Sequence, residues 1–324
     1  MKAVLCRSLD GPEALTIEEL PDPVAGPGEV VVRVRAAGLN YFDTLVVRGK
    51  YQTQPALPFS PCGEIAGVVE SVGPGVTDWR PGQRGMAYLG TGGARERVAV
   101  AVGRLIAIPD GVTDAVACGV PITYGTAIHG LRERGNLQRG ESVVVLGASG
   151  GAGLAAVEIA KLMGARVIAV ASSPEKLAVC RNHGADETVS TKSDDLKGAL
   201  RLLTYQQGVD IVYDCVGGPL AEPAFRALAW KGRYLVVGFA SGDVPKVPFN
   251  LFLLKGAAAI GVFWGEAVKR NLPGYRSDMI FALDAVAGGH LKPHVHAILP
   301  LERFGEAIAL LDRREAVGKV VLSV

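Results

Sequence analysis

A glycine-rich turn between two apolar runs most constrains the fold of this chain. The segment GASGGAG, residues 147–153, follows the apolar run 142–146 and precedes a stretch with helical spacing, which we expect to begin near Gly153. A second apolar run, residues 166–171, comes after that helix. This order of strand, glycine turn, helix and strand is the dinucleotide-binding fingerprint of a Rossmann fold, whereas an ordinary tight turn does not require it.

The residues of the turn have separate expected roles. Gly150 would let the backbone approach a diphosphate closely, and Gly153 would let the helix pack tightly on the strand. The N-terminus of the helix adds free N–H groups and the positive end of its dipole. We therefore expect the diphosphate of a dinucleotide at Ser149, Gly150, Gly151, Ala152 and Gly153.

The end of the second strand indicates which dinucleotide binds. A site that selects NAD places Asp or Glu there, to accept hydrogen bonds from the ribose hydroxyls. This chain has Ser172 and Ser173 instead, followed by Lys176. Hydroxyls and an ammonium suit a 2′-phosphate, which predicts NADPH. The alternative is a solvated turn in which a serine caps a helix that begins at Pro174, and both interpretations can hold together.

The sequence pattern changes along the chain, and 324 residues favour two domains over one. Before residue 122, short runs such as residues 29–38 and 63–73 predict strands of an antiparallel or barrel-like unit. Residues 122–264 alternate continuous apolar runs with helical segments, which predicts a parallel α/β sheet. Residues 265–324 are too few to fold alone, and we expect them to pack on the first domain.

Charge and cysteine usage exclude several classes of protein. The 34 basic and 32 acidic residues give a net charge of +2, and no basic run suggests a nucleic-acid or membrane surface. Glycines and charged residues interrupt the most apolar windows, so we expect no membrane span. The N-terminal apolar run is too short for a secretory signal. Five widely spaced cysteines predict reduced thiols and a cytoplasmic protein.

Motifs in family order over essentially the whole chain resemble the medium-chain dehydrogenase/reductase superfamily, and within it the zinc-free NADPH:quinone oxidoreductase family. They are AAGLNYFDTLVVRGKY, LPFSPCGEIAGVVESVGPGV, VPITYGTAIHGL, LGASGGAGLAAVEIAKLMGARVIAVASSPEKL, DIVYDCVGG, LVVGFASG and GKVVLSV. The resemblance implies an α/β protein with a GroES-like catalytic domain, residues 1–121 and 265–324. It also implies a Rossmann domain, residues 122–264, with the active site in the cleft.

The resemblance also bears on metal content. Zinc-dependent relatives bind a catalytic zinc through a Cys and through the His of a G-H-E triplet, and these positions are Asn40 and Gly63 here. Residues 85–110 contain no cysteine, so the four-cysteine lobe of those relatives is missing as well. We therefore expect no zinc. His294 and His296 would share a face of a strand, but a turn that leads into a strand is the expected structure there.

Further site residues follow from the resemblance. Asn40 and Tyr51 are the expected polar groups beside the substrate, with loop anchoring and ordinary aromatic packing as their alternatives. Thr191 stands where many members have a Tyr that holds the 2′-phosphate, and Cys62 replaces a usual Gly. The other expected cofactor contacts, for which strand-end packing is the alternative, are Thr126, Gly238, Phe239, Ala240, Ser241, Val262, Phe263, Trp264 and Lys319.

Together these features predict an NADPH-dependent reductase of quinones or other electron-poor conjugated carbonyls that works without a metal. We expect a small-molecule substrate, no nucleic-acid or membrane partner, and a homodimer, in which the apolar stretch 250–263 offers a strand that could continue the sheet across a two-fold axis. Two alternatives remain open. One is an enoyl-thioester reductase that acts on substrates such as acrylyl-CoA, and the other is an NADPH-binding protein with little turnover and a structural or RNA-associating role.

Overall fold

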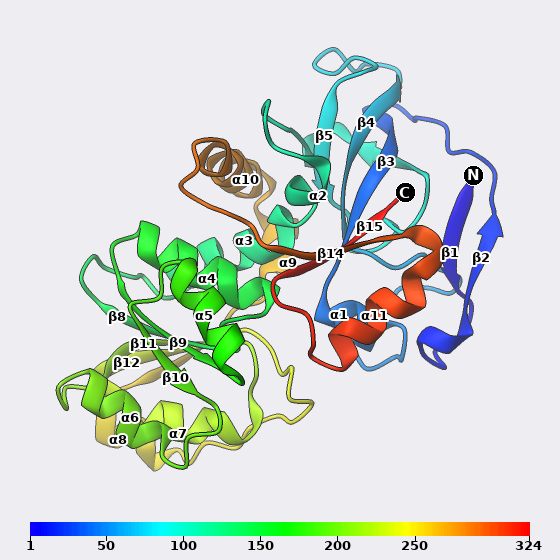
Figure 1. Ribbon diagram of the computed structural model, residues 1–324. Coiled ribbons are helices and arrows are strands. Elements are labelled where there is room, and N and C mark those ends of the chain that lie inside the picture. The colour runs from blue at the N-terminus through cyan, green and yellow to red at the C-terminus, as the bar shows by residue number, and fades with distance from the viewer. The chain divides into compact units, whose positions relative to one another are not determined.

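The computed structural model describes residues 1–324, and the chain divides into two compact units (Figure 1). One unit contains Met1–Ile122, Val268–Gly289 and Pro293–Val324. The other contains Thr123–Ala267 and His290–Lys292. Two helices have residues in both units: α3 (Val120–Ile128) and α9 (Trp264–Arg270).

The second unit is built on a parallel sheet of six strands in the order β10-β9-β8-β11-β12-β13. Its strands are β8 (Ser142–Leu146), β9 (Arg166–Ala171), β10 (Glu187–Ser190), β11 (Val209–Asp214), β12 (Leu228–Val236) and β13 (Ala258–Gly261). Apolar runs become such strands because helices cover both faces of the sheet. The jump in order between β8 and β11 is the doubly wound Rossmann topology, which confirms the predicted fold.

Helices cover both faces of this sheet (Figure 1). One face carries α4 (Gly151–Leu162) and α5 (Pro174–Asn182), and the other carries α6 (Leu196–Leu203), α7 (Ala221–Arg226) and α8 (Asn250–Lys255). Leu200 of α6 and Phe225 of α7 form one buried cluster with Val144 and Val212 of the sheet. A π-helical segment, η3 (His129–Arg134), and a short 3-10 turn, η4 (Gly218–Leu220), complete the unit.

The first unit is β-rich, as predicted for a GroES-like domain. Its main sheet has seven strands in the order β14-β15-β3-β4-β5-β7, and β6 pairs with β3; a separate sheet joins β1 and β2. The strands are β1 (Lys2–Cys6), β2 (Leu15–Glu19), β3 (Glu29–Leu39), β4 (Glu64–Val72), β5 (Arg84–Tyr88), β6 (Arg97–Ala101), β7 (Leu105–Ala107), β14 (Val295–Pro300) and β15 (Lys319–Ser323). The helical elements are η1 (Pro12–Ala14), α1 (Tyr41–Val46), η2 (Val102–Arg104), α2 (Asp114–Ala117), α10 (Leu272–Ala287), η5 (Leu301–Arg303) and α11 (Phe304–Asp312).

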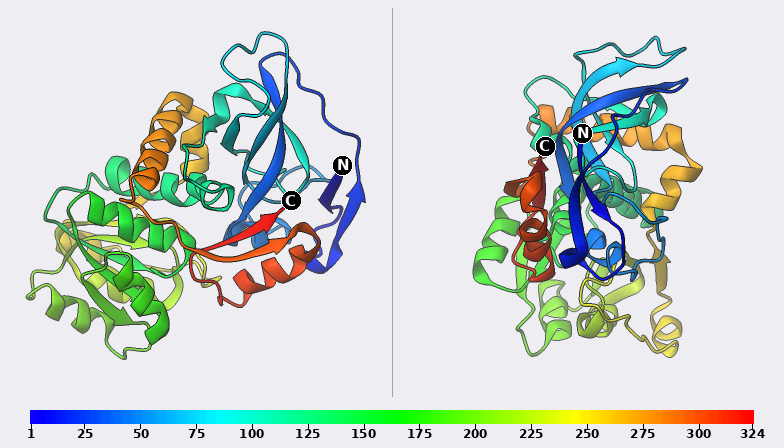
Figure 2. Two further views of the ribbon diagram at one scale, coloured as in Figure 1. Left: turned by 45° about the horizontal axis from the view of Figure 1, so that its top comes forward. Right: turned by 90° about the vertical axis from the view of Figure 1, so that its right-hand side faces the viewer.

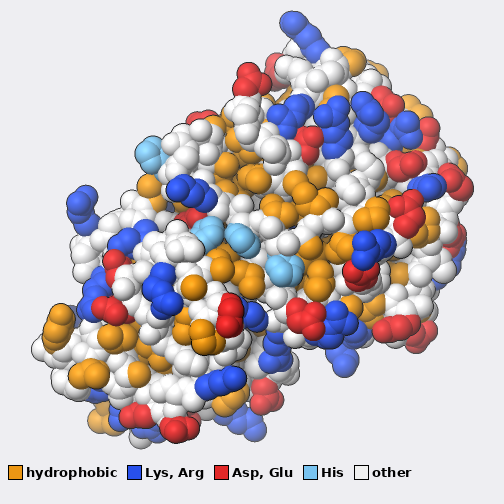
Figure 3. All heavy atoms as spheres, in the orientation of Figure 1, with side chains coloured by type: hydrophobic (Ala, Val, Ile, Leu, Met, Phe, Trp, Pro, Cys, Tyr) orange, Lys and Arg blue, Asp and Glu red, His pale blue; other side chains and the backbone are white.

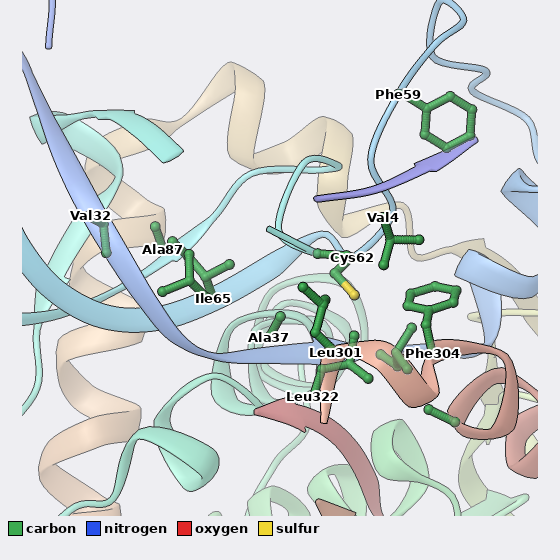
Figure 4. Close-up of a cluster of buried hydrophobic side chains, with 14 of the residues drawn as sticks. Val4, Val32, Ala37, Phe59, Cys62, Ile65, Ala87, Leu301, Phe304 and Leu322 are labelled. Atoms are coloured by element: carbon green, nitrogen blue, oxygen red, sulfur yellow. The ribbon is translucent and has the colours of Figure 1, made fainter. Parts of the chain in front are cut away.

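The C-terminal segment completes the N-terminal sheet. Strand β15 pairs antiparallel with β3, with Val320 opposite Leu39, and both views of Figure 2 show the two strands alongside each other. The hydrophobic core confirms this association, because Leu301 and Phe304 lie in one buried cluster with Ile65 of β4 (Figure 4). Residues from the two ends of the chain therefore share one core.

Two local expectations were wrong. Helix α4 begins at Gly151 and not near Gly153, so the last three residues of the glycine turn already belong to the helix. The apolar stretch 250–263 is not one strand, because its first part forms α8, which ends at a left-handed Gly256 (φ 56°). Only Ala258–Gly261 is a strand. A continuous apolar run has neither helical nor strand periodicity, so the pattern could not separate these two structures.

The glycine turn yields a stability prediction. A Cβ atom on Gly153 would overlap the carbonyl oxygen of Gly147 and lie 2.7 Å from the Cα of Ala148, whereas a Cβ on Gly150 would meet only ordinary contact at 3.5 Å. Backbone atoms cannot move aside as a side chain does. We expect Gly153→Ala to lower the free energy of unfolding by about 1–3 kcal/mol. The control Gly150→Ala should stay within about 0.5 kcal/mol of the natural protein.

Urea unfolding of the three proteins measures these differences. Equal stability of the two variants would contradict the close approach of α4 to the turn.

Candidate active site

The glycine turn of the second unit leaves the start of α4 without a capping side chain. Gly147 has a left-handed backbone (φ 73°), which turns the chain directly after β8. Gly150 is the N-cap of α4, and no side chain bonds the first N–H groups of the helix. Gly151 and Ala152 are partly exposed. N–H groups in this arrangement can bind a phosphate, so the turn fits a dinucleotide.

At the end of β9 the two serines have different environments. Ser173 is the N-cap of α5, where its hydroxyl oxygen accepts a hydrogen bond from the Lys176 backbone N–H at 3.3 Å. The capping interpretation therefore applies to this serine. A hydrogen bond from Ser173 also lowers the pKa of the exposed Glu175 carboxyl, followed by a smaller contribution from the charge of Lys192. Ser172 is exposed, while Lys176 and Thr191 are half-buried.

Lys192 is a cation that the sequence interpretation missed. It follows Thr191 directly in the loop after β10, and its charge reaches Glu175 at the start of α5. Lys192 thus lies close enough to the start of α5 for its charge to favour the ionised form of Glu175. The sequence signal, a lysine beside the position of the family's Tyr, was present, but the partner helix could not be known from the pattern.

Backbone hydrogen bonds join the loops that follow β11 and β12. The N–H of Gly238 donates to the carbonyl of Asp214 at 3.1 Å, and the N–H of Ser241 donates to the carbonyl of Val216 at 2.9 Å. Ala240 donates to Cys215 in the same manner, at 3.1 Å. These bonds fix the backbone of Gly238, Phe239, Ala240 and Ser241, which is partly exposed.

Asp214 holds one of these loops through hydrogen bonds, and the sequence analysis did not predict it. Its buried carboxylate accepts hydrogen bonds from the backbone N–H groups of Val216 (2.7 Å) and Gly217 (2.9 Å) and from the Tyr234 hydroxyl (2.5 Å). Burial raises the pKa of this carboxyl. A Cβ on Gly147 would lie 2.7 Å from the Val216 side chain, so the loop that Asp214 holds also contacts the glycine turn.

The remaining predicted cofactor residues of this unit are mostly packed side chains. The Trp264 ring lies against α3, since a Cβ on Gly125 would be 2.5 Å from its ring atoms. Trp264 and Val262 are buried, whereas Phe263 is 48% exposed. Thr126, also on α3, is half-buried. Thr126 and Trp264 therefore lie at neighbouring positions, and the Trp264 side chain packs in the core.

Three polar side chains meet at strand ends of the first unit: Asn40 after β3, Glu64 at the start of β4 and Lys319 at the start of β15. The Lys319 ammonium donates to the Asn40 Oδ1 at 2.7 Å and forms an ion pair with Glu64 Oε1. Asn40 Nδ2 donates to the same Glu64 oxygen at 2.9 Å. The second oxygen of Glu64 accepts from the Ile122 backbone N–H at 2.7 Å. Lys319 was predicted to reach the nicotinamide, and Glu64 was not predicted.

A second carboxylate lies beside this cluster. Asp43 is buried in α1, where it accepts hydrogen bonds from the backbone N–H groups of Asn40 (2.8 Å) and Cys62 (3.1 Å). Burial raises the pKa of Asp43 to about 7, although these two bonds and the charge of Lys319 oppose the shift. Asp43 is therefore a group that changes its charge near neutral pH.

Tyr51 is half-buried, and its ring packs on Phe42 with the centroids 5.4 Å apart. Burial raises the pKa of its hydroxyl, followed by a smaller effect of the Asp43 charge. The phenol is therefore protonated at neutral pH and can donate a hydrogen bond. The structure places no hydrogen bond between Tyr51 and the Asn40 cluster.

Cys62 is a core residue. Its backbone is left-handed (φ 66°), and its side chain lies in the hydrophobic cluster with Val4 and Leu301 (Figure 4). Burial raises the pKa of the thiol far above its usual range, which disfavours a nucleophilic thiolate.

The chain does not provide a zinc site where its zinc-dependent relatives have one. No group of three or more His, Cys, Asp or Glu side chains is placed to hold a metal ion. A Cβ on Gly63 would lie 2.9 Å from the Gly90 carbonyl oxygen and 3.0 Å from the Phe42 ring, so no larger side chain fits there. His294 lies in the turn before β14, as expected, and His296 lies within the strand.

Comparison with known proteins agrees with this architecture. Residues 26–110 match the alcohol dehydrogenase GroES-like domain, and residues 151–280 match the family described as zinc-binding dehydrogenase. The quinone oxidoreductase-like protein 2 of Bos taurus is 37% identical over 324 residues, which cover 100% of this chain and 92% of the relative. The acryloyl-coenzyme A reductase of Metallosphaera sedula is 31% identical, with full coverage of both chains.

A solved structure extends the similarity. The quinone oxidoreductase of Thermus thermophilus, determined alone and with NADPH, has a TM-score of 0.89, 34% identity and full coverage of both chains. The fold and these matches define a medium-chain dehydrogenase/reductase. Within that superfamily, the chain belongs to the quinone oxidoreductase-like family. In the structure, no helix has both the length and the apolar character that crossing a membrane requires.

Asp43 predicts how stability depends on pH. In the folded chain this carboxyl keeps its proton up to about pH 7, whereas its ordinary pKa is 3.8. Unfolding therefore releases a proton between these values, and a rise in pH favours the unfolded state. The stabilisation is complete below the ordinary pKa and is lost as the pH rises through about 7.

Urea unfolding of the natural protein and of Asp43→Asn between pH 4.5 and 8 tests this dependence. The stability of the natural protein relative to the variant should fall across the range, with a slope of at most about 1.4 kcal/mol per pH unit. A constant difference would show that Asp43 is ionised throughout.

Proposed function

We propose that this protein is a metal-independent reductase that uses NADPH to reduce quinones or other electron-poor conjugated carbonyls. The observation that carries the proposal is the Asn40–Glu64–Lys319 cluster, in which the Asn40 amide, at a position where the zinc-dependent relatives have a metal ligand, is bonded to Glu64 and Lys319. Such a group supplies hydrogen-bond donors and no metal to polarise a carbonyl, which suits substrates that are already strongly electrophilic.

NADPH is the proposed cofactor. The uncapped start of α4 fits a diphosphate, and no carboxylate stands at the end of β9, where Ser172 is exposed. The Thermus thermophilus relative was crystallised with NADPH. NADPH when bound supplies a hydride from C4 of its nicotinamide. The chain then has to hold the nucleotide, through the α4 turn and Ser172, Lys176 and Thr191, and to stabilise the product.

Hydride transfer to a conjugated carbonyl places negative charge on the carbonyl oxygen. Tyr51 and Asn40 are the proposed donors to that oxygen, since the phenol is protonated and Asn40 is partly exposed. Quinones need the least assistance, because the reduced ring becomes aromatic and solvent can protonate an exposed oxygen. Enones, which are α,β-unsaturated ketones, depend more on the donors of the protein.

The direct experiment is steady-state NADPH oxidation with a panel of ortho-quinones, enones and enoyl-CoA thioesters. We expect the quinones to be turned over fastest. NADPH binding without turnover of any of the three classes would refute the proposed reaction.

A reductase of enoyl-CoA thioesters is the second candidate, favoured by the similarity to the Metallosphaera sedula reductase. The coenzyme A phosphates would need basic side chains, and Arg48, one candidate, is already engaged with Asp312 at 2.7 Å. A purely RNA-associating role has less support. Acidic and basic side chains are both spread over the face drawn in Figure 3, and the net charge is only +2.

Lys176 predicts cofactor preference. A hydrogen bond to a charged group contributes roughly 1.5–3 kcal/mol, so Lys176→Ala should weaken NADPH binding about 10- to 100-fold and NADH binding little. Dissociation constants from fluorescence titration with both cofactors measure the effect. Lys197→Ala, which removes an exposed lysine on α6, is the matched control and should change neither value. Equal weakening for NADPH and NADH would remove Lys176 from the 2′-phosphate site.

Tyr51 predicts substrate dependence. Loss of a donor from a site that excludes water can cost up to about 10²–10³ in rate, so Tyr51→Phe should slow enone or enoyl reduction at least about 10-fold. Quinone reduction should fall much less, and the NADPH dissociation constant should not change. Initial rates on both substrate classes give the comparison. Rates equal to those of the natural protein on both would leave Asn40 as the remaining donor.

The edge of the Rossmann sheet predicts a dimer. Strand β13 is an edge strand, and the nearby α8 region exposes Phe249 (88%), Leu253 (81%) and Leu254 (68%). Such an edge and apolar surface suit pairing with a second copy across a two-fold axis. Light scattering at micromolar concentration should give the dimer mass for the natural protein and the monomer mass for Leu253→Glu. A monomeric natural protein would contradict this arrangement.

A further inference from the structure

The Asn40 side chain is fixed between two groups of opposite hydrogen-bonding character. A lysine ammonium only donates, and an ionised carboxylate only accepts. The amide oxygen must therefore face Lys319, and the amide nitrogen must face Glu64, as the distances of 2.7 Å and 2.9 Å show. The rotated amide would place N–H groups against the ammonium. The charged pair thus dictates which side of the Asn40 amide is the donor.

The pair that imposes this orientation is itself inaccessible. The Lys319 side chain is 5% exposed and the Glu64 side chain is not exposed, while Asn40 is partly exposed. Glycines make room for the pair, since a Cβ on Gly38 would lie 2.7 Å from the Glu64 Oε1 and a Cβ on Gly119 would lie 3.1 Å from the Lys319 stem. Solvent and ligands therefore meet Asn40 and not the charges behind it.

Stability alone does not account for such a pair. Desolvation of two charges offsets most of their attraction, and apolar replacements of buried ion pairs are often neutral or stabilising. The Lys319–Glu64 pair instead has a geometric consequence, which is the orientation of Asn40. It also has an electronic consequence, because the bond from the ammonium polarises the amide and makes the Nδ2–H group a stronger donor.

We propose that Lys319 and Glu64 are positioning residues that orient and polarise Asn40 as the donor to the carbonyl oxygen of the substrate. One hydrogen of Asn40 Nδ2 is bonded to Glu64, and the second is the one offered to the substrate. Asn40 donates a hydrogen bond and transfers no proton. With NADPH bound as the hydride donor, an enone would take the hydride at its β-carbon, its alkene electron pair would move to the bond beside the carbonyl carbon, and the carbonyl π pair would move onto oxygen. Solvent, or Tyr51 reprotonated by solvent, would supply the proton. This inference rests on the proposed function.

The test combines single and double substitutions. Glu64→Gln leaves a buried ammonium and Lys319→Met leaves a buried carboxylate, so each single variant should lower the melting temperature. The double variant Glu64→Gln/Lys319→Met removes both charges and should recover most of that loss. We nevertheless expect its kcat for enone reduction to stay at least about 10-fold below that of the natural protein, with the KM and the NADPH dissociation constant changed less than about threefold.

Two further variants separate positioning from a structural role. Asn40→Ala should reduce kcat in the natural protein but cause little further loss in the double variant, because the donor is already disoriented there. Lys319→Arg keeps the charge and the donor, and should retain more activity than Lys319→Met when both are assayed at a temperature well below their melting temperatures. If the double variant does not fold, the activities of these two Lys319 variants test the positioning role on their own.

A double variant with natural kcat, additive effects of Asn40→Ala, or equal activity of the two Lys319 variants would each overturn the positioning role. In all these cases the natural enzyme still oxidises NADPH with its substrate. Failure of the proposed function is a different result, since the natural protein itself would then show no turnover with any member of the substrate panel.

Discussion

The pairing of β15 with β3 is the constraint on which the polar site of the first unit depends. Lys319 is the first residue of β15, and it lies 279 residues from Asn40 along the sequence. The antiparallel register that sets Val320 opposite Leu39 brings the Lys319 ammonium to the end of β3. Glu64 begins β4, which pairs with β3 in the same sheet. The order of these three strands therefore brings an ammonium, a carboxylate and an amide into contact.

Under the proposed function, the two units supply different parts of the site. The second unit provides a helix start without a capping side chain and two loops fixed by the Asp214 carboxylate. The first unit provides a buried ion pair and two partly exposed donors, Asn40 and Tyr51. Under the proposed mechanism, an oriented amide and a phenol would take the place at the substrate oxygen that zinc, a Lewis acid, has in the zinc-dependent relatives.

Sequence patterns predicted the fold far better than they predicted the site. The apolar run 166–171 is β9 to the residue, because its short length, its β-branched residues and the nearby Gly164 favour a strand over a helix. The first part of 250–263 was misjudged, because apolar content alone does not separate helix from strand. Glu64, Asp214 and Lys192 were missed because their roles come from contacts between distant segments. Lys319 was predicted as a site residue from its motif near the end of the chain. The spacing of neighbouring residues could not indicate its partner Glu64, which lies in β4.

The measurement that tests this account most directly is NADPH oxidation by the purified protein with an ortho-quinone, before and after exhaustive treatment with a zinc chelator. Metal content is determined on the same samples by elemental analysis. The account predicts the same turnover in both samples and well under one zinc per chain. Turnover that disappears with removal of a stoichiometric zinc and returns when zinc is restored would contradict the central claim.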